Sequence, residues 1–327
     1  MPDKPERKIL DIIDGVKTIA ISGHVHPDGD CAGSTLGLYN YLKENTDAEV
    51  TVFLEEPGEH LKSLPGASSI VNELPYNAHF DLFFMMDCGE AGRLGKMDKL
   101  LKMADKTVCI DHHISSQGIC NENYIFPELS SASEVLFEML DPKKVSKETA
   151  ECIYTGILHD TGVFHHNCTS KRTMEIAGFL MSRGIDFSKI IDEGFYAKTY
   201  KQNQILGRCL MESMLLWNGT VIVSYLTKKE LEFYETDGKD LGGIIDQLRL
   251  TEGVKVAIFL YEAQSQSFKV SMRSTVTDVD LSVVASYFGG GGHKMAAGCT
   301  ISGNAHDVIN SITKQLEIIL RSRKYIK

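Results

Sequence analysis

The sequence lacks the features that direct a chain out of the cell or into a membrane. Its first residues, MPDKPERKILDIIDG, are charged and contain neither the apolar segment nor the cleavage site of a signal peptide. No uncharged apolar run approaches the length of a membrane span. The eight cysteines are scattered without a C-x-x-C pair, which is typical of reduced, buried thiols and not of a disulfide framework or zinc knuckle. We therefore expect a cytoplasmic protein with no membrane contact.

The chain also lacks the excess of positive charge found in proteins that coat long nucleic acids. It contains 34 basic and 44 acidic side chains, for a formal net charge of −10. Residues 1–195 hold 18 Lys and Arg against 31 Asp and Glu, whereas residues 196–327 hold 16 against 13. This balance argues against long DNA as a partner. The acidic first part has either an ordinary acidic surface or carboxylates that bind cations.

The length of 327 residues, with 43% hydrophobic and 24% charged side chains, favours two folded domains. In the first part, short apolar runs alternate with helical patterns, which predicts βαβ units and an α/β domain with a parallel sheet. The runs expected to be strands are Thr18–Ser22, Thr51–Leu54, Leu82–Met86 and Thr107–Ile110. The expected helices are Ala32–Lys43, Ala91–Met103, Ala132–Leu140 and Lys147–His159.

The pattern changes in the last third of the chain, where strands with partial alternation mix with helices. The expected strands are Thr220–Leu226, Val254–Ala263 and Phe268–Arg273, and the expected helices are Lys228–Tyr234, Asp280–Phe288 and Ala305–Ser322. This predicts a smaller C-terminal α+β domain. We place the first domain at residues 1–190, a helical connector at 191–212 and the second domain at 213–327.

Polar side chains follow three of the four strands expected in the first domain. They are His24, Asp28 and Asp30 after the first strand, Asp87 after the third, and Asp111, His112 and His113 after the fourth; Asp160 ends a later helical stretch. Functional crevices of open α/β sheets lie at the carboxyl ends of strands. So many carboxylates would repel one another and raise one another's pKa values unless cations were bound. Mixed His and Asp ligands suit Mn²⁺ or a similar first-row metal better than Ca²⁺.

In the second domain, four successive glycines at 289–292 precede His293. Such a run can present backbone N–H groups to a phosphate, but it could instead be a flexible turn that ends the helix Asp280–Phe288. Arg273, on an expected strand, can hold a phosphate through two hydrogen bonds, or it is an ordinary solvated charge.

Together these motifs resemble those of the DHH phosphoesterase superfamily. GHVHPDGD, Asp87, Asp111-His112-His113 and Asp160 follow the order of its four N-terminal motifs. SMRS (Ser271–Ser274) and GGGGHKMAAG (Gly289–Gly298) resemble its DHH-associated C-terminal domain. The pairing is similar to the nanoRNase / 3′-phosphoadenosine 5′-phosphate phosphatase branch and spans nearly the whole chain. It implies a parallel-sheet DHH domain and a smaller α+β domain, with an active-site cleft between them.

The resemblance implies two divalent metal ions, Mn²⁺ first, with Mg²⁺ or Co²⁺ as alternatives. The implied ligands form two sites that share one residue: His24 and Asp28 for one ion, Asp30, His112 and Asp160 for the other, and Asp87 for both. Asp111 would orient a neighbouring imidazole. His113 would contact a substrate phosphate or donate a proton to the leaving oxygen. The implied substrate-binding residues are Arg273, Ser274, Gly290, Gly291, Gly292, His293 and Ala297.

The implied activity is hydrolysis of short 5′-phosphorylated oligoribonucleotides and linear dinucleotides such as pApA and pGpG to mononucleotides. It would extend to removing the 3′-phosphate of 3′-phosphoadenosine 5′-phosphate to give AMP. A homodimer formed through the first domain is expected from the resemblance alone. The alternatives are a cyclic-di-AMP phosphodiesterase and, from a different class, an inactive nucleotide-binding regulator.

Overall fold

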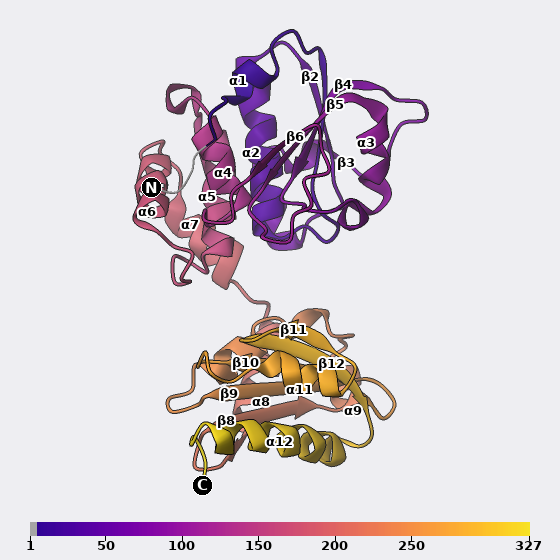
Figure 1. Ribbon diagram of the computed structural model, residues 1–327, viewed down its shortest axis with the longest axis vertical. Coiled ribbons are helices and arrows are strands. Elements are labelled where there is room, and N and C mark those ends of the chain that lie inside the picture. Colours follow the sequence, from indigo (N-terminus) through magenta and orange to yellow (C-terminus); the bar gives the residue numbers. More distant parts are fainter. Residues whose placement is uncertain (1–4) are drawn as a thin grey trace. The chain divides into compact units, whose positions relative to one another are not determined.

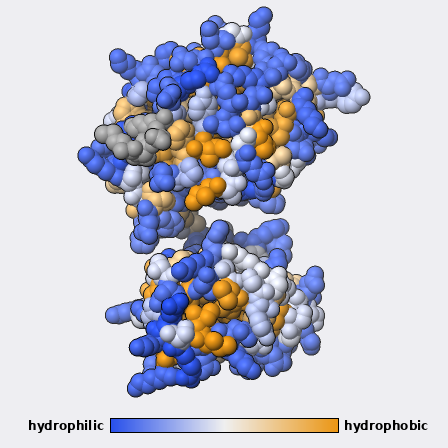
Figure 2. Space-filling view, in the orientation of Figure 1, coloured by the Kyte–Doolittle hydropathy of each residue, from blue (hydrophilic) through white to orange (hydrophobic). Residues whose placement is uncertain are grey.

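The structure, a computed structural model, describes residues 5–327 and divides the chain into two compact units, Met1–Ala197 and Lys198–Lys327 (Figure 1). The predicted connector, residues 191–212, straddles this boundary, because it includes both the π-helical turn Asp192–Tyr196 and helix α8 (Tyr200–Met211). Within residues 5–327, no helix combines the length and apolar character needed to cross a bilayer. Figure 2 shows mostly hydrophilic residues on the visible face of the first unit, and a hydrophobic patch beside residues of intermediate hydropathy on that of the second.

The first unit is built on the predicted parallel sheet, with six strands in the order β3-β2-β1-β4-β5-β6. Its strands are β1 (Thr18–Ser22), β2 (Glu49–Phe53), β3 (Ile70–Val71), β4 (Phe80–Met86), β5 (Ala104–Asp111) and β6 (Glu122–Ile125). The apolar runs predicted β1, β2, β4 and β5. The edge strands β3 and β6 escaped prediction because β3 has only two residues and β6, with the sequence ENYI, lacks a continuous apolar run.

Helices cover both faces of this sheet (Figure 1). The helices of this unit are α1 (Ile9–Ile12), α2 (Gly29–Asn45), α3 (Leu100–Met103), α4 (Ala132–Met139), α5 (Lys147–Asp160), α6 (Lys171–Met181) and α7 (Phe187–Ile191), of which α6 packs on α4 and α5 and α7 on α5. Short 3₁₀ turns lie at Glu59–Leu61, Ala67–Ser69 and Pro142–Lys144. The single helix predicted at Ala91–Met103 was wrong: Ala91–Lys99 is a 3₁₀ segment that Gly95, at φ 56°, interrupts before α3 begins.

The second unit contains a mixed sheet in the order β11-β12-β10-β9-β8-β7, in which only β8 and β9 are parallel. Its strands are β7 (Met214–Leu216), β8 (Val221–Leu226), β9 (Val256–Gln264), β10 (Ser267–Ser274), β11 (Gly291–His293) and β12 (Ala296–Ser302). Its helices, besides α8, are α9 (Lys228–Phe233), α10 (Ile244–Arg249), α11 (Leu281–Tyr287) and α12 (Ala305–Ser322), with a 3₁₀ turn at Lys239–Leu241. The predicted α+β character is confirmed.

The two faces of this second sheet are covered unequally. Helices α11 and α12 pack on one face against apolar residues of β8, β9, β10 and β12. On the other face, the buried apolar cluster draws its residues from α8–α10, β8, β9 and neighbouring segments, and none of its described members lies on β10, β11 or β12. The corresponding face of these three strands is therefore free of that cluster.

Candidate functional site

The carboxyl ends of three adjacent strands, β1, β4 and β5, bring the polar residues of the first unit together. His24 lies just beyond β1, Asp87 directly follows β4, and Asp111 is the last residue of β5. Parallel strands end at the same edge of a sheet, so side chains far apart in sequence meet there. Helix α5 adds Asp160, its last residue.

The six predicted metal ligands form one connected cluster, in which Asp87 lies between two imidazoles. Oδ2 of Asp87 is 3.4 Å from Nε2 of His24, and Oδ1 is 3.7 Å from Nε2 of His112. Nε2 of His24 is also 3.7 Å from Oδ1 of Asp28. Nε2 of His112 lies 3.0 Å from Oδ2 of Asp160 and 4.0 Å from Oδ2 of Asp30.

Hydrogen bonds outside the cluster fix the direction of several of these side chains. Nδ1 of His24 is 2.8 Å from the carbonyl oxygen of Val25, an arrangement that leaves Nε2 to face the carboxylates. Asp28 caps helix α2, and its Oδ1 accepts from the N–H groups of Asp30 and Cys31 at 3.1 and 3.0 Å.

Asp30 is held by helix α4, a contact that the sequence did not reveal. Its fully buried carboxylate accepts from the N–H groups of Ala132 at 2.6 Å and Ser133 at 3.0 Å. Ser131 caps this helix through the N–H of Glu134. Serine before an apolar helical run is a recognisable start signal, and it could have placed the helix N-terminus but not its acidic partner.

The buried carboxylates and imidazoles of the cluster have shifted pKa values. Burial raises the pKa values of the Asp30 and Asp87 carboxyl groups. Burial opposes the charge on His112, but its hydrogen bond to Asp160 and the nearby carboxylates outweigh it and raise its pKa to about 9. Hydrogen bonds to Asp28 and Asp87 likewise outweigh burial and raise the pKa of His24.

The residues fit the divalent metals that the sequence implies. Oδ1 of Asp87 is buried without a hydrogen-bond partner among the described residues, and the backbone of Asp87 adopts a φ of 49°. A buried carboxylate with an unsatisfied oxygen between two imidazoles is typical of a site built for a cation. Ligand atoms within 4.8 Å of one another define three groups: His24, Cys31 and Asp87; Asp87, His112 and His113; and Asp30, His112 and Asp160.

Cys31 belongs to one of these groups, whereas Asp28 belongs to none of them. Burial raises the pKa of the Cys31 thiol to about 12, so this side chain stays protonated near neutral pH and packs as a small apolar group. Asp28 has a 60% exposed side chain, and its pKa falls to about 2 because hydrogen bonds, the one to His24 foremost, outweigh burial.

Asp111 and His113 form a pair beside the cluster. Nδ1 of His113 is 2.7 Å from Oδ1 of Asp111, which also accepts the N–H of His112 at 2.9 Å. The hydrogen bond between the His113 ring and the Asp111 carboxylate raises the pKa of His113. The same nitrogen lies 3.6 Å from Asp87, so the His113 ring borders the carboxylate cluster.

In the second unit, the strand register places Arg273 and His293 on one face of the sheet. Arg273 of β10 pairs with Ala296 of β12, and Ala296 pairs with His293 of β11. Directly paired residues point to the same side of a sheet. Nε of Arg273 lies 3.9 Å from the carboxylate of Asp246, a neighbour that the sequence did not suggest.

Two other predicted substrate residues do not reach this face. The hydroxyl of Ser274 is buried and donates to the carbonyl oxygen of Val276 at 2.9 Å. Ala297 belongs to the apolar core between the sheet and helices α11 and α12. Ser274 follows Arg273 and Ala297 follows Ala296 by one position. Because successive side chains of a strand point to opposite faces, both point into the core.

The glycine run has structural tasks in addition to any role in binding. The N–H groups of Gly289 and Gly290 donate to Ser286 and Ala285 at the end of α11, which matches the interpretation of a turn that ends a helix. Gly291 and Gly292 begin the edge strand β11. At Gly290 a Cβ atom would lie 2.2 Å from the carbonyl oxygen of Gly298, so only glycine fits there.

Comparison with known protein families decides the relationship. The model of the DHH family, N-terminal domain, matches residues 18–157, and that of the DHHA1 domain matches residues 218–321. The chain is a DHH–DHHA1 protein. The predicted superfamily is confirmed, and each of the two domain matches lies within one of the two compact units.

Two curated relatives match this chain over most of their own length. The chain is 29% identical to the bifunctional oligoribonuclease and PAP phosphatase NrnA of Thermus thermophilus, over 90% of this chain and 87% of the relative. It is 26% identical to the protein of the same name from Bacillus subtilis, over 94% and 96%. A crystal structure of an exopolyphosphatase-related protein from Bacteroides fragilis matches with a TM-score of 0.84 and 28% identity, over 94% of both chains.

Proposed function

We propose that this DHH–DHHA1 protein is a phosphoester hydrolase that cleaves short 5′-phosphorylated oligoribonucleotides and linear dinucleotides to mononucleotides. We extend the proposal to conversion of 3′-phosphoadenosine 5′-phosphate to AMP. The position of Asp87 between His24 and His112 carries the proposal, because it joins all six predicted ligands into one cluster. Similarity to the oligoribonuclease and PAP phosphatases along nearly the whole chain supports the substrate class.

Two divalent metal ions, with Mn²⁺ as the first choice, would occupy this cluster. His24, Asp28 and Asp87 would hold one, and Asp30, Asp87, His112 and Asp160 the other. When bound, such metals activate water and stabilise charge on phosphoryl oxygens. Asp30 would be held in position by the N-terminus of α4, so its carboxylate need not reorganise during the reaction.

His113 would act on the substrate side of the site. Asp111 occupies its Nδ1, so Nε2 is the ring nitrogen left to contact a phosphate or to pass a proton to the leaving oxygen. In the second unit, Arg273 and His293 would hold the terminal 5′-phosphate from the exposed face of the sheet. Neither Ser274 nor Ala297 has a place in this proposal, because both point into the core.

The test is Mn²⁺-supported turnover of a panel that includes pApA, pGpG, a short and a long RNA, 3′-phosphoadenosine 5′-phosphate and cyclic-di-AMP. We expect the short 5′-phosphorylated substrates to be hydrolysed fastest. Asp87→Asn should lower activity by more than about 100-fold, because mutation of a residue that only contacts a metal's ligands already costs about 10–100-fold. Asparagine tolerates the left-handed backbone of this position, so the variant should keep its thermal unfolding temperature.

Arg273→Ala separates binding of the terminal phosphate from catalysis. It should raise KM for pApA more than for an aryl phosphodiester that has no terminal phosphate. Equal losses on both substrates would contradict the phosphate-holding role. Wild-type protein that binds nucleotides but hydrolyses none of the panel would favour the inactive regulator, and a preference for cyclic-di-AMP would favour that phosphodiesterase.

A further inference from the structure

Arg273 and His293 lie on the face of the second sheet opposite to helices α11 and α12, which we call the open face. This face contains a cavity that neither of these two residues lines. Its volume is about 440 Å³, within the range of small-molecule sites. Its floor is made by β10 and β12, with Tyr261 of β9 on one side and Phe288–Gly290 on the other. The residues of these two strands that line it are Lys269, Val270, Ser271, Gly298, Cys299 and Thr300, of which Val270 and Cys299 also belong to the apolar core on the opposite face.

The register of the sheet connects this cavity to Arg273. Lys269, Ser271 and Arg273 alternate along β10 with buried residues, so they share one face. Lys269 lies four residues from Arg273, which is roughly 13 Å along a strand that rises about 3.3 Å per residue. A phosphate at Arg273 therefore leaves Lys269 to contact another part of the same ligand.

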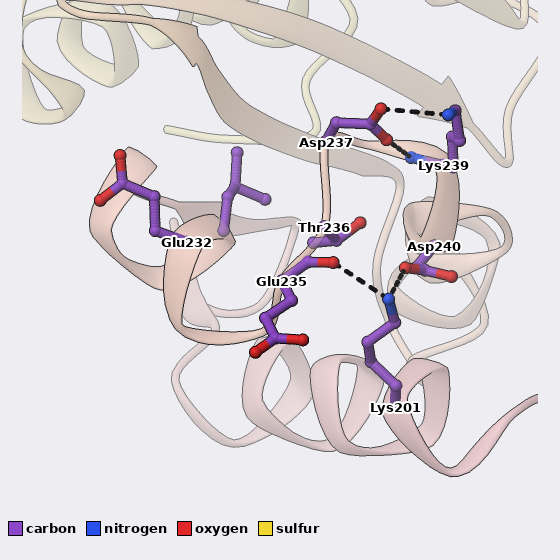
Figure 3. A pocket seen from close by; sticks show the side chains of 8 residues that line it. Lys201, Glu232, Glu235, Thr236, Asp237, Lys239 and Asp240 are labelled. Carbon is purple, nitrogen blue, oxygen red and sulfur yellow. Dashed lines mark hydrogen bonds and ion pairs between the residues drawn. The ribbon is translucent and has the colours of Figure 1, made fainter.

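Lys269 is the charged group of the cavity, and it is available. Its side chain is exposed and has no ion-pair partner in the part of the chain that the structure describes, residues 5–327. A second cavity, lined by residues of α8, α9 and the segment after α9, differs in this respect (Figure 3). There Lys201 contacts Asp240 at 2.6 Å and Lys239 contacts Asp237 at 3.2 Å, so its cations are already neutralised.

We propose that the cavity over β10 and β12 binds the nucleobase of the nucleotide whose 5′-phosphate lies at Arg273, and that it favours guanine. The inference rests on the proposed function, which places that phosphate. A lysine ammonium only donates hydrogen bonds. Guanine presents two acceptors, O6 and N7, on one edge, whereas adenine presents a donor beside its N7.

The rest of the cavity suits a flat base. Gly298 leaves the middle of the floor without a side chain, and the hydroxyl groups of Ser271 and Thr300 can donate or accept at the edges of a base. Tyr261, half-buried at the border, offers an aromatic side chain. Stacking on an aromatic ring would add affinity for any base, so discrimination falls to Lys269.

Equilibrium binding of GMP and AMP to the full chain in EDTA tests the proposal, because no hydrolysis is needed. We expect GMP to bind about tenfold more tightly than AMP, as one charge-assisted contact to a base edge provides. Lys269→Ala should lower the affinity for GMP about tenfold, to that for AMP, and leave the affinity for AMP unchanged. Lys314→Ala is the matched control, because Lys314 is exposed on α12, which packs on the opposite face of the sheet.

Equal affinity of the wild-type chain for GMP and AMP would overturn the proposal. An equal loss of affinity for both nucleotides in Lys269→Ala would also overturn it, because Lys269 would then be a general contact for negative charge. If the chain prefers GMP through Lys269 but hydrolyses nothing with Mn²⁺, the base site stands and the proposed function is rejected. If the chain hydrolyses the substrates but shows no base preference, the proposed function stands and the base site is rejected.

Discussion

Asp87 shows at the scale of one residue what the candidate site costs the fold. Its backbone adopts a φ of 49°, which few residues other than glycine, asparagine and aspartate occupy readily. Its side chain is 3% exposed, and burial together with the nearby carboxylates of Asp28 and Asp160 raises its pKa. Unfavourable burial of a carboxylate is expected where function, and not stability, determines the arrangement.

The raised pKa of His112 predicts that metal binding releases protons. An imidazole must be neutral to coordinate a metal, and the pKa of about 9 means that His112 is protonated at pH 7 without metal. Affinity for Mn²⁺ should therefore rise as the pH rises towards about 9. Calorimetric titration at pH 7 in two buffers of different ionisation enthalpy should show release of about one proton or more per chain. The same heat in both buffers would contradict this expectation.

At the scale of elements, the second sheet depends on close approach of β11 to β12. The edge strand β11 carries Gly291 and Gly292, and Gly290 directly precedes it. These glycines differ in the room that they leave for a side chain. A Cβ atom added at Gly290 would overlap the backbone of Gly298 and Cys299, whereas one added at Gly291 would have nothing within 4 Å. The four glycines look equivalent in the sequence, but the pairing of the strands makes them unequal.

Gly290→Ala should therefore destabilise the second unit by about 1–3 kcal/mol, as overpacking does. Gly291→Ala in the same run should change the unfolding free energy by no more than about 0.5 kcal/mol. Thermal or urea unfolding of both variants checks the difference. Equal effects of the two substitutions would show that the run is a flexible loop with no close strand contact.

The whole molecule consists of two units that differ in architecture and in charge. Each has its own apolar core, a parallel sheet between helices in the first and a mixed sheet in the second. Lys198–Lys327 holds 16 basic against 13 acidic residues, and all the excess acidity belongs to the first unit. The predicted metal ligands account for part of that acidity, and the more basic unit presents Arg273 and Lys269. Net charge thus argues against long polymers without excluding a short anionic substrate.

Brief treatment with trypsin tests where the units join. Residues 196–200 are all exposed, and Lys198 lies outside regular structure between the π-helical turn and α8. We expect early cleavage after Lys198, which would give two fragments that resist further digestion. Lys198→Gln should delay that cleavage. Initial cleavage inside α8 would instead support the predicted connector of residues 191–212 as a separate element.

The sequence by itself determined the parallel sheet of the first unit and the residues that gather at its edge. It could do so because continuous apolar runs mark buried strands, and because parallel strands must end together, which carries His24, Asp87 and His112 to one place. The short edge strands β3 and β6 and the break at Gly95 leave no such pattern.

Only the tertiary structure decided which side chains share one face of the second sheet. Alternation along β10 and β12 turns Ser274 and Ala297 into the core while Arg273, Ser271 and Lys269 share the open face, and a shift of one residue in register would reverse this. The hold of helix α4 on Asp30 likewise joins residues about 100 positions apart, which no local pattern records. Motif order predicts the chemistry, but register and packing determine which side chains lie together.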